Sequence, residues 1–442
     1  MNLRLVASFG LVCAALLLAG CDEGRQAPGR VTVQVVNAAP GFGSLAFQRE
    51  QDSSRGAEMP FKDAQAFVYD ADTYDFYVIE RTLRDADPGR TWTFAPTLEE
   101  KTNYLFVLTE VAGEIQPIVI ATPTPPAADA QILVMNAAGS LPAMDLYLER
   151  PGVGIAGATP RGTFNPQEHL TPPPLPSGDY ELFLTAAGNP ADVILKSPQF
   201  NLPSSTTSAI VVVADSGQTT ARASALLLQS VPIVLFDVNA PSELRAINGA
   251  TDQAPRDLAV NSQFSPPLFP AIPFAAPTAH TPLTVGASTI NVTPVGDPGV
   301  LELTSPYTAA IGQRATVLFS GPAGALLPIY AADDLRHFNR EAKLRFMNVA
   351  STFLAVDFVI TSPGGDPNQP FPVAQLFAPG VSDYVPLYPD DYDLYLLQAG
   401  TTTVLSGPTR ISVAAGGIYS ALAIDGSDTA TVNLRLLDGF AP

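Results

Sequence analysis

Two acidic clusters are the residues of this sequence best suited to bind a metal ion. They are Asp70, Asp72 and Asp75 in the first quarter of the chain, and Asp390, Asp391 and Asp393 near its end. Carboxylates spaced closely along a loop are the hard oxygen ligands that Ca²⁺ prefers. Aspartate is also a common turn residue, because its side chain accepts hydrogen bonds from its own backbone. Calcium binding and plain turn formation are therefore the alternatives, and no other cofactor is expected.

Residues for catalysis are scarce. The three histidines, His169, His280 and His337, have no histidine or cysteine at metal-ligand spacing. No sequence motif of a serine hydrolase or zinc protease occurs. Residues 152–157 match G-x-G-x-x-G, but Pro160 follows too soon for the helix that a dinucleotide site needs. An enzyme is not expected. The alternative is a hydrolase whose site lies between domains, which would require His169 or His280 beside an acid in a deep polar cleft.

The amino-terminal segment indicates chemistry of a different kind. A short basic start precedes an apolar run that ends in Leu-Ala-Gly and then Cys21. A run this short, ending in small residues, is typical of a secretory signal and not of a transmembrane helix. Its ending resembles the lipobox of bacterial lipoproteins. This resemblance implies diacylglyceryl attachment to the Cys21 sulfur, cleavage of residues 1–20 and acylation of the new amino terminus.

The residues after the cysteine bear on which membrane of the cell envelope would hold the protein. Asp22 and Glu23 resemble an inner-membrane retention signal, but sorting rules differ among bacterial groups. The outer membrane and the periplasmic face of the inner membrane therefore both stay open. Residues 21–30 are expected to form a short tether. No later stretch is apolar enough to span a membrane, so we expect the protein to attach to the membrane only through its lipid anchor.

Composition narrows the class of protein further. The 442 residues include 43 prolines and 33 glycines, and the formal net charge is -19. Dense prolines disfavour helices, and an acidic surface repels phosphate backbones. Nucleic acid is therefore excluded as an expected partner.

The body of the chain is a fourfold repeat. Each copy has a short apolar strand, an asparagine followed by small residues and turn formers, and a second strand. The asparagines are Asn37, Asn136, Asn239 and Asn348, spaced by 99, 103 and 109 residues. A second landmark is a turn with a tyrosine that launches another strand, and it holds Tyr74, Tyr180 and Tyr392. Ser288 takes the tyrosine's place in the third copy. Recurrence at one position favours packing, with the ring buried and the hydroxyl bonded to backbone.

These landmarks predict an all-β protein of four tandem antiparallel β-sandwich modules, immunoglobulin-like, after a lipoprotein signal peptide. The expected modules are residues 31–122, 130–229, 231–334 (the divergent one) and 343–442. We expect them in a row, projecting from the anchor. Residues 333–343 are expected to be a charged linker with at most one helical turn. The Pro-rich residues 264–282 fit either a docking ligand or a loop packed over its own sheet edge.

The repeated opening motif is similar to the bacterial family catalogued as domain of unknown function 4397. Asn136-Ala137-Ala138 with Met144-Asp145-Leu146-Tyr147 carries the resemblance in the second copy, and Asn348-Val349-Ala350-Ser351 with Val356-Asp357-Phe358 carries it in the fourth. The first copy lacks the aspartate, and the third matches least. The resemblance implies extracytoplasmic β-sandwich modules, often tandem and often in lipoproteins. It implies no activity.

Together these features predict a non-catalytic, lipid-anchored protein of the bacterial cell envelope. Its repeated modules would act as a binding or spacer array for a protein or glycan. Trp92 is the only tryptophan available as a glycan platform, although tyrosines could substitute. A calcium-dependent adhesin and an envelope hydrolase with an inter-module site are the alternatives.

Overall fold

The chain was studied as a computed structural model that describes residues 29–52, 56–81, 89–124, 127–353, 355–368, 373–426 and 431–440. Every regular element in these ranges is a β-strand, which confirms the predicted all-β fold. No helix of the described residues is long and apolar enough to cross a membrane. The predicted signal peptide and the residues Cys21, Asp22 and Glu23 lie outside the described part of the chain.

Module 1 is a sandwich of two four-stranded sheets. The first sheet has the order β4 (Ala64–Asp70), β1 (Arg30–Asn37), β7 (Tyr104–Val111) and β8 (Glu114–Ala121). The second has the order β3 (Glu58–Pro60), β2 (Ser44–Arg49), β5 (Phe76–Arg81) and β6 (Thr91–Phe94). Because side chains alternate along β5, Phe76 and Val78 point into the core of the module. There the rings of Phe47 and Phe76 stack with their centroids 5.0 Å apart.

Module 2 repeats this plan with longer sheets. One sheet contains β12 (His169–Leu170), β9 (Gln131–Asn136), β16 (Thr207–Ala214), β17 (Ala223–Leu228) and β18 (Ile233–Leu235). The other contains β11 (Gly162–Phe164), β10 (Met144–Glu149), β13 (Gly178–Ala186) and β14 (Asn189–Lys196), with β15 (Phe200–Leu202) also on β13. Because β18 pairs with β17, this module extends to Leu235, past the predicted boundary at residues 229–231.

Modules 3 and 4 have the same two-sheet plan. The first sheet of module 3 has β22 (Thr281–Leu283), β19 (Ser242–Ala250), β25 (Arg314–Gly321) and β26 (Leu327–Ala332). Its second sheet has β21 (Phe269–Ile272), β20 (Arg256–Val260), β23 (Gly286–Pro294) and β24 (Leu303–Ala309). The first sheet of module 4 has β30 (Gly380–Val381), β27 (Ala342–Asn348), β34 (Ile418–Asp425) and β35 (Val432–Phe440), with β31 (Val385–Leu387) also on β27. Its second sheet has β29 (Ala374–Phe377), β28 (Ala355–Thr361), β32 (Asp390–Gln398) and β33 (Val404–Val413).

Among the named strands of the described residues, pairing is antiparallel except at one place in every module. The first strand of each module runs parallel to one later strand of the same sheet: β1 to β7, β9 to β16, β19 to β25, and β27 to β34. The predicted sandwich is therefore confirmed, with one parallel pair at the centre of each first sheet. These central strands are apolar on both faces, which is typical of strands covered on both sides.

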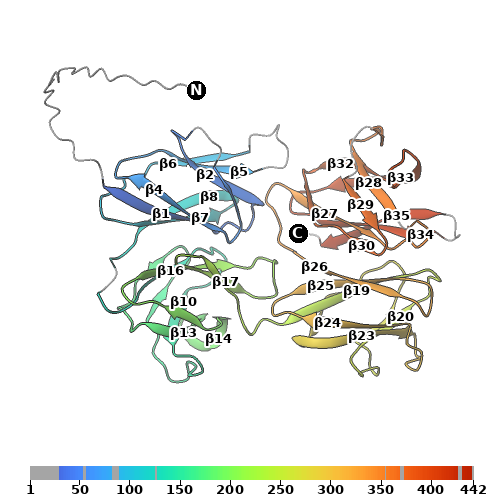
Figure 1. Cartoon of the computed structure of the whole chain (residues 1–442), viewed down its shortest axis with the longest axis horizontal. Helices are drawn as coiled ribbons and strands as arrows, with labels where there is room; N and C mark the ends of the chain where they lie inside the picture. Colours follow the sequence, from blue (N-terminus) through green and yellow to red (C-terminus); the bar gives the residue numbers. More distant parts are fainter. Residues whose placement is uncertain are drawn as a thin grey trace, which may run out of the picture.

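The four modules are arranged at the corners of a square and not in a row (Figure 1). The first sheets of modules 1 and 2 pack face to face through Val36, Leu105, Met135 and Val211. Those of modules 3 and 4 pack through Ile247, Leu318, Met347 and Leu422. The predicted extended row is therefore wrong, because the outer faces of the first sheets are as apolar as the inner faces and bury each other.

Candidate functional site

Two of the recurrent asparagines join the two sheets of their module, and the third bonds only to the turn after its strand. Asn37 accepts a hydrogen bond from the N–H of Ala39 at 3.0 Å and donates to the carbonyl of Met59 on β3 at 2.8 Å. Asn348 accepts from Ala350 and donates to Leu376 on β29, both at 3.0 Å. Asn136 accepts from Ala138 at 3.1 Å. All three side chains are fully buried, so they end the first strand and fix the fold, and none is positioned to meet a ligand.

The third asparagine was predicted at the wrong position. Asn239 is exposed in a turn, where its N–H donates to the Asp237 carboxylate at 3.1 Å. Asn248 takes the equivalent place: it is fully buried, accepts from Ala250 at 3.0 Å and donates to the Ile272 carbonyl at 3.1 Å. The Asn-Ala-Pro sequence at 239–241 imitates the motif, whereas the true copy reads Asn-Gly-Ala.

The recurrent tyrosines are buried or half-buried and hold the turn before their strand. Each hydroxyl donates to the carbonyl four residues earlier: Tyr74 to Asp70 at 3.1 Å, Tyr180 to Pro176 at 2.6 Å and Tyr392 to Tyr388 at 3.0 Å. This is the geometry of a tyrosine corner, a structural device of β-sandwiches. Their role is therefore structural.

Aspartates on the second strand of three modules hold a hairpin. Each accepts the N–H of a glycine in left-handed conformation: Asp145 from Gly188 at 2.7 Å, Asp257 from Gly296 at 2.9 Å and Asp357 from Gly400 at 2.8 Å. Asp257 was missed from the sequence because the third copy was aligned on Asn239. The alternating Asp-Leu-Ala-Val at 257–260 is the signal that could have found it.

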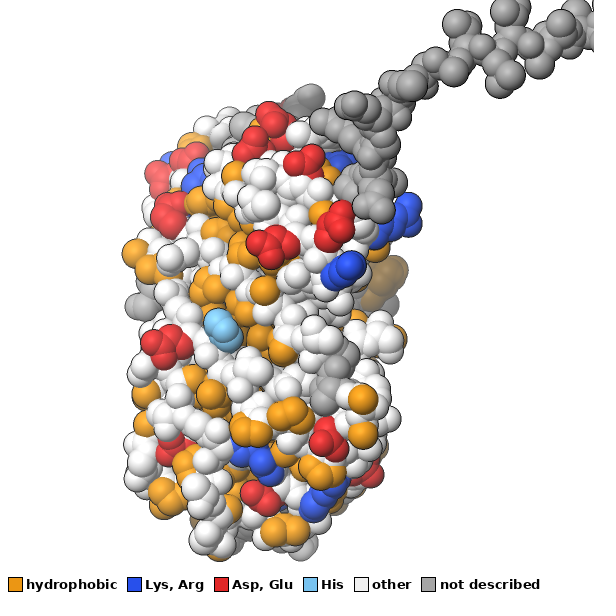
Figure 2. Space-filling model, turned by 90° about the vertical axis from the view of Figure 1, so that its left-hand side faces the viewer, with side chains coloured by type: hydrophobic (Ala, Val, Ile, Leu, Met, Phe, Trp, Pro, Cys, Tyr) orange, Lys and Arg blue, Asp and Glu red, His pale blue; other side chains and the backbone are white. Residues whose placement is uncertain are grey.

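In neither acidic cluster do the three carboxylates point toward one shared position. Asp70, Asp72 and Asp75 are exposed, and the Asp72 carboxylate accepts the N–H of Thr73 at 2.8 Å. Figure 2 shows acidic side chains scattered over the module 1 end of that face of the molecule. Asp390 accepts the N–H of Asp391, and Asp391 accepts the hydroxyl of Ser412. Asp393 is buried against Arg410, whose hydrogen bonds hold the pKa of Asp393 below its usual range.

No metal-ligating group of three or more acidic, histidine or cysteine side chains occurs among the described residues. Residues 152–157 form a loop with Gly152, Gly154 and Gly157 in left-handed conformation, and no helix follows. The Pro-rich residues 264–282 contribute β21 and bury Phe269 and Ile272 in module 3, which supports the loop interpretation. Trp92 packs edge-on against Phe42 and donates to Glu114 at 2.8 Å.

Residues 333–343, here called the central segment, contact all four modules. The N–H of Leu335 donates to Gly217 of module 2 at 3.1 Å, and the N–H of Asn339 donates to Gly41 of module 1 at 2.8 Å. Arg340 forms an ion pair of 3.0 Å with Glu80 of module 1. The segment contains no helical turn, so the predicted linker is extended, and it crosses the centre of the molecule.

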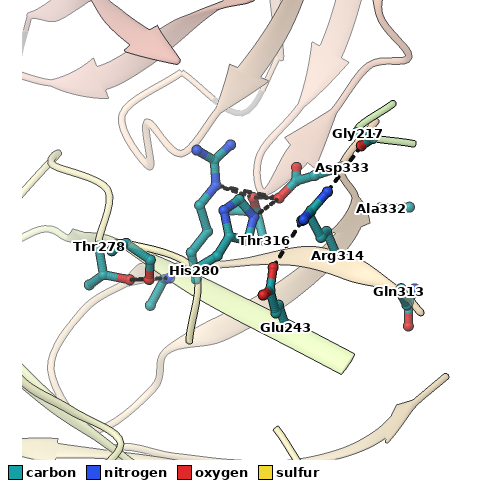
Figure 3. A network of polar contacts seen from close by, with 12 residues as sticks. Gly217, Glu243, Thr278, His280, Gln313, Arg314, Thr316, Ala332 and Asp333 are labelled. Atoms are coloured by element: carbon teal, nitrogen blue, oxygen red, sulfur yellow. Dashed lines mark hydrogen bonds and ion pairs between the residues drawn. The ribbon is translucent and has the colours of Figure 1, made fainter. Parts of the chain in front are cut away.

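Asp333 joins modules 3 and 4 at the start of this segment (Figure 3). Its carboxylate lies 2.8 Å from His280 Nε2, accepts the Thr316 hydroxyl at 2.7 Å and pairs with Arg345 at 2.6 Å. Arg245 lies 3.4 Å away. Burial opposes ionisation of Asp333, but hydrogen bonding to His280 and the two guanidinium groups outweigh it and hold its pKa well below its usual range. Burial lowers the pKa of Arg245.

His280 therefore lies beside an acid, as the hydrolase alternative required, but not in a cleft. Its side chain is 10% exposed and the Asp333 side chain is 0% exposed, so substrate has no access to the pair. His169 is exposed on edge strand β12, and exposed His337 contacts the Gly416 carbonyl at 2.5 Å. The arrangement at Asp333 can balance buried charge and lock modules together.

Ionisable groups are also buried at the end of the central segment and in the part of module 4 beside it. Burial lowers the pKa of Lys343 to about 8, although Asp334, at 3.3 Å from its ammonium group, opposes the shift. Burial raises the pKa of Tyr384 to about 12. Both side chains line a cavity of about 310 Å³ between module 4 and Ser44 and Arg81 of module 1. A larger cavity, about 610 Å³, lies between modules 1 and 2 and is lined mainly by small side chains.

The fold and these contacts define a protein of tandem β-sandwich modules closed around one segment. The family model described as "Domain of unknown function (DUF4397)" matches residues 242–359, from the start of β19 into β28. This match confirms the resemblance drawn from the repeated motif. It falls mainly on module 3, which the sequence comparison judged the most divergent copy because that copy was aligned on Asn239.

Similarity to other known proteins is distant. No curated protein matches the chain. Among solved structures, the Bacillus anthracis TIE protein is 11% identical with a TM-score of 0.15, and the match covers 86% of this chain and 65% of that one. A Streptococcal ancillary pilin is 11% identical with a TM-score of 0.14, covering 70% and 99% of the two chains. The chain thus spans about two thirds of the length of the first of these.

Proposed function

We propose that the protein is a non-catalytic, lipid-anchored component of the bacterial cell envelope that presents a rigid block of four modules to a protein or glycan. The observation that carries this proposal is the central segment, whose contacts fix all four modules in one body. A body closed in this way holds its surface loops at fixed separations. It is therefore suited to recognising one large partner and poorly suited to acting as an extended spacer.

The anchor is the second part of the proposal. Cleavage before Cys21 and acylation of its sulfur and amino group would tether the block through residues 21–30. The anchor would lie in the outer membrane or at the periplasmic face of the inner membrane. The net charge of -19 makes nucleic acid an unfavourable partner.

The anchor is tested by producing the full chain and a Cys21→Ser variant in a Gram-negative host. The proposal expects a mature amino terminus at Cys21 with acyl mass on it, and expects the variant to leave the membrane fraction. Density-gradient separation then assigns the membrane. A mature chain that keeps residues 1–20, or that has no acyl mass, contradicts the anchor.

The binding role is tested by crosslinking the anchored chain in intact envelopes and identifying the captured partner. A partner whose crosslinks fall on two or more modules supports recognition by the assembled block. Crosslinks confined to one module, unchanged when the block is opened by a Gly217→Ala change, contradict it.

A further inference from the structure

Module 3 lacks the side chain that fills the tyrosine corner of the other three modules. Tyr180 and Tyr392 are the third residues of β13 and β32, and Ser288 is the third residue of β23. The Ser288 hydroxyl donates to the Tyr307 carbonyl on β24 at 3.3 Å, away from the turn. The residue four positions before it is Thr284. Its carbonyl therefore corresponds to the acceptors at Asp70, Pro176 and Tyr388.

In modules 1 and 2 an arginine also forms a lid over the tyrosine ring. The Arg150 guanidinium lies 4.2 Å from the centre of the Tyr180 ring, and Arg49 lies 5.3 Å from that of Tyr74. A Cβ atom on Gly178 would lie 2.6 Å from Arg150 Nη1, which shows how closely this lid fits. At Gly286, the equivalent glycine of module 3, the same position has no atom within 4 Å.

A cavity occupies this place in module 3. It measures about 290 Å³, and Ser288, Thr284 and Leu283 form part of its wall with Val260 and Leu268 from across the corner. Asn261 and Gln263 stand at its rim, and both are exposed. The corresponding cavity of module 4 measures about 240 Å³ and has Tyr392 among its lining residues. The module 3 cavity, here called the tyrosine socket, therefore has a wall of apolar side chains and two hydroxyl side chains, amide groups at the rim and no aromatic residue in its lining.

We propose that the tyrosine socket binds a 4-hydroxyphenyl ring from outside the module. The apolar wall would cover the ring faces, and the phenol would donate to the Thr284 carbonyl as the internal tyrosines donate in modules 1, 2 and 4. The residues that line the socket carry no charge, so a neutral ring is favoured over an anion or a cation. The ring can belong to a small phenol or to a tyrosine side chain of a partner protein.

The site is independent of the lipid anchor, so the two proposals fail separately. Every described strand lies between Arg30 and Phe440, so the chain from Gly29 onward contains all of them and is the sample for this test. Para-cresol is titrated by calorimetry and by saturation-transfer NMR, with toluene as the matched probe that lacks the hydroxyl. We expect a Kd for para-cresol on the order of 1 mM and about fivefold weaker binding of toluene.

Variants at Ser288 separate the socket from other apolar sites. Ser288→Tyr and Ser288→Phe fill it from within, so para-cresol binding should fall at least tenfold while the melting temperature stays equal or rises. Ser288→Ala keeps the socket empty and should bind as the parent does. Equal binding by the parent and both filled variants overturns the proposal, as does the absence of para-cresol binding to the parent.

The source of the ring is decided by a third probe, N-acetyl-tyrosinamide. Binding as tight as that of para-cresol, lost in Ser288→Tyr, indicates a tyrosine side chain of a partner. Binding of para-cresol alone indicates a small phenol, because the socket then excludes a peptide backbone at its rim. Both results retain the proposed ring chemistry.

Discussion

Asp333 and Arg345 form a 2.6 Å ion pair between the central segment and module 4, and neither side chain is more than 1% exposed. Around this pair, His280 and Thr316 of module 3 contact the same carboxylate. A buried charge is stable only when it is paired and hydrogen-bonded. This pair therefore commits modules 3 and 4 to one arrangement, and the rest of the central segment attaches modules 1 and 2 to it.

Replacing the buried acid should destabilise the protein strongly. Asp333→Asn removes the carboxylate that pairs with buried Arg245 and Arg345, so we expect a loss of about 3–5 kcal/mol in the free energy of unfolding. Urea denaturation followed by fluorescence measures it. The matched control is Asp192→Asn, because Asp192 pairs with Arg222 at the surface, where both side chains are more than 40% exposed. That change should cost less than about 1 kcal/mol. Equal costs would contradict the role given to Asp333.

Stability should depend on pH through Lys343. Its folded pKa, about 8, is below the ordinary value of 10.5, so between these values the unfolded chain binds more protons than the folded one. The free energy of unfolding should therefore rise as the pH increases from 8 to 10. Below pH 8 the contribution of Lys343 should not change with pH. The charges near it are Asp334, Arg336 and Arg345. Lys343→Met removes the titration, so its urea midpoint should rise less over this pH interval. If the urea midpoint of Lys343→Met rises with pH as steeply as that of the parent, Lys343 is not the group that titrates.

The corrected third repeat makes a prediction about two asparagines. Asn248→Ala deprives the Ala250 N–H and the Ile272 carbonyl of their partners, and should cost about 2–4 kcal/mol. Asn239→Ala changes an exposed turn and should alter stability by less than about 0.5 kcal/mol. Thermal melting of the two variants tests the register directly. The opposite ranking would restore the original alignment on Asn239.

Two glycines offer a matched test of the central segment. Gly217 has φ +98°, and a Cβ atom there would lie 2.5 Å from the Leu335 carbonyl oxygen. Gly217→Ala should therefore displace the central segment and raise trypsin cleavage at Arg336 or Arg340 by about tenfold or more. Gly188 has φ +72° with no atom within 4 Å of its added Cβ. Gly188→Ala adds backbone strain alone and should leave cleavage of the central segment unchanged. Similar cleavage of both variants would mean that the segment is not packed as described.

The strands and the repeat could be predicted from the sequence because local patterns determine them. Asn136 and Tyr180 mark a strand end and a strand start, and alternation around Met144 and Leu146 places them in the core. The position of Asn248 was missed because Asn239-Ala240-Pro241 matches the Asn-Ala opening of the first two copies more closely than Asn248-Gly249-Ala250 does. A motif this short can be matched by chance at a neighbouring position, as it is at Asn239.

The arrangement of the modules depends on contacts that no local pattern specifies. Arg345 and Asp333 look like solvated charges in the sequence, and only the packing of modules 3 and 4 buries them. One signal was present: Ile210 to Val213 and Leu105 to Leu108 are continuous apolar runs, which are typical of strands covered on both faces. These runs indicated that the first sheets needed a second covering layer. They did not indicate that a neighbouring module would supply it.

Small-angle X-ray scattering of the chain from Gly29 onward tests the closed four-module body most directly. A single compact body of this length has a radius of gyration of about 22–25 Å, whereas four modules in a row would give about 40 Å. We predict the compact value, and an increase for Gly217→Ala relative to Gly188→Ala. A radius of gyration near the extended value for the parent chain would contradict the closed arrangement around residues 333–343.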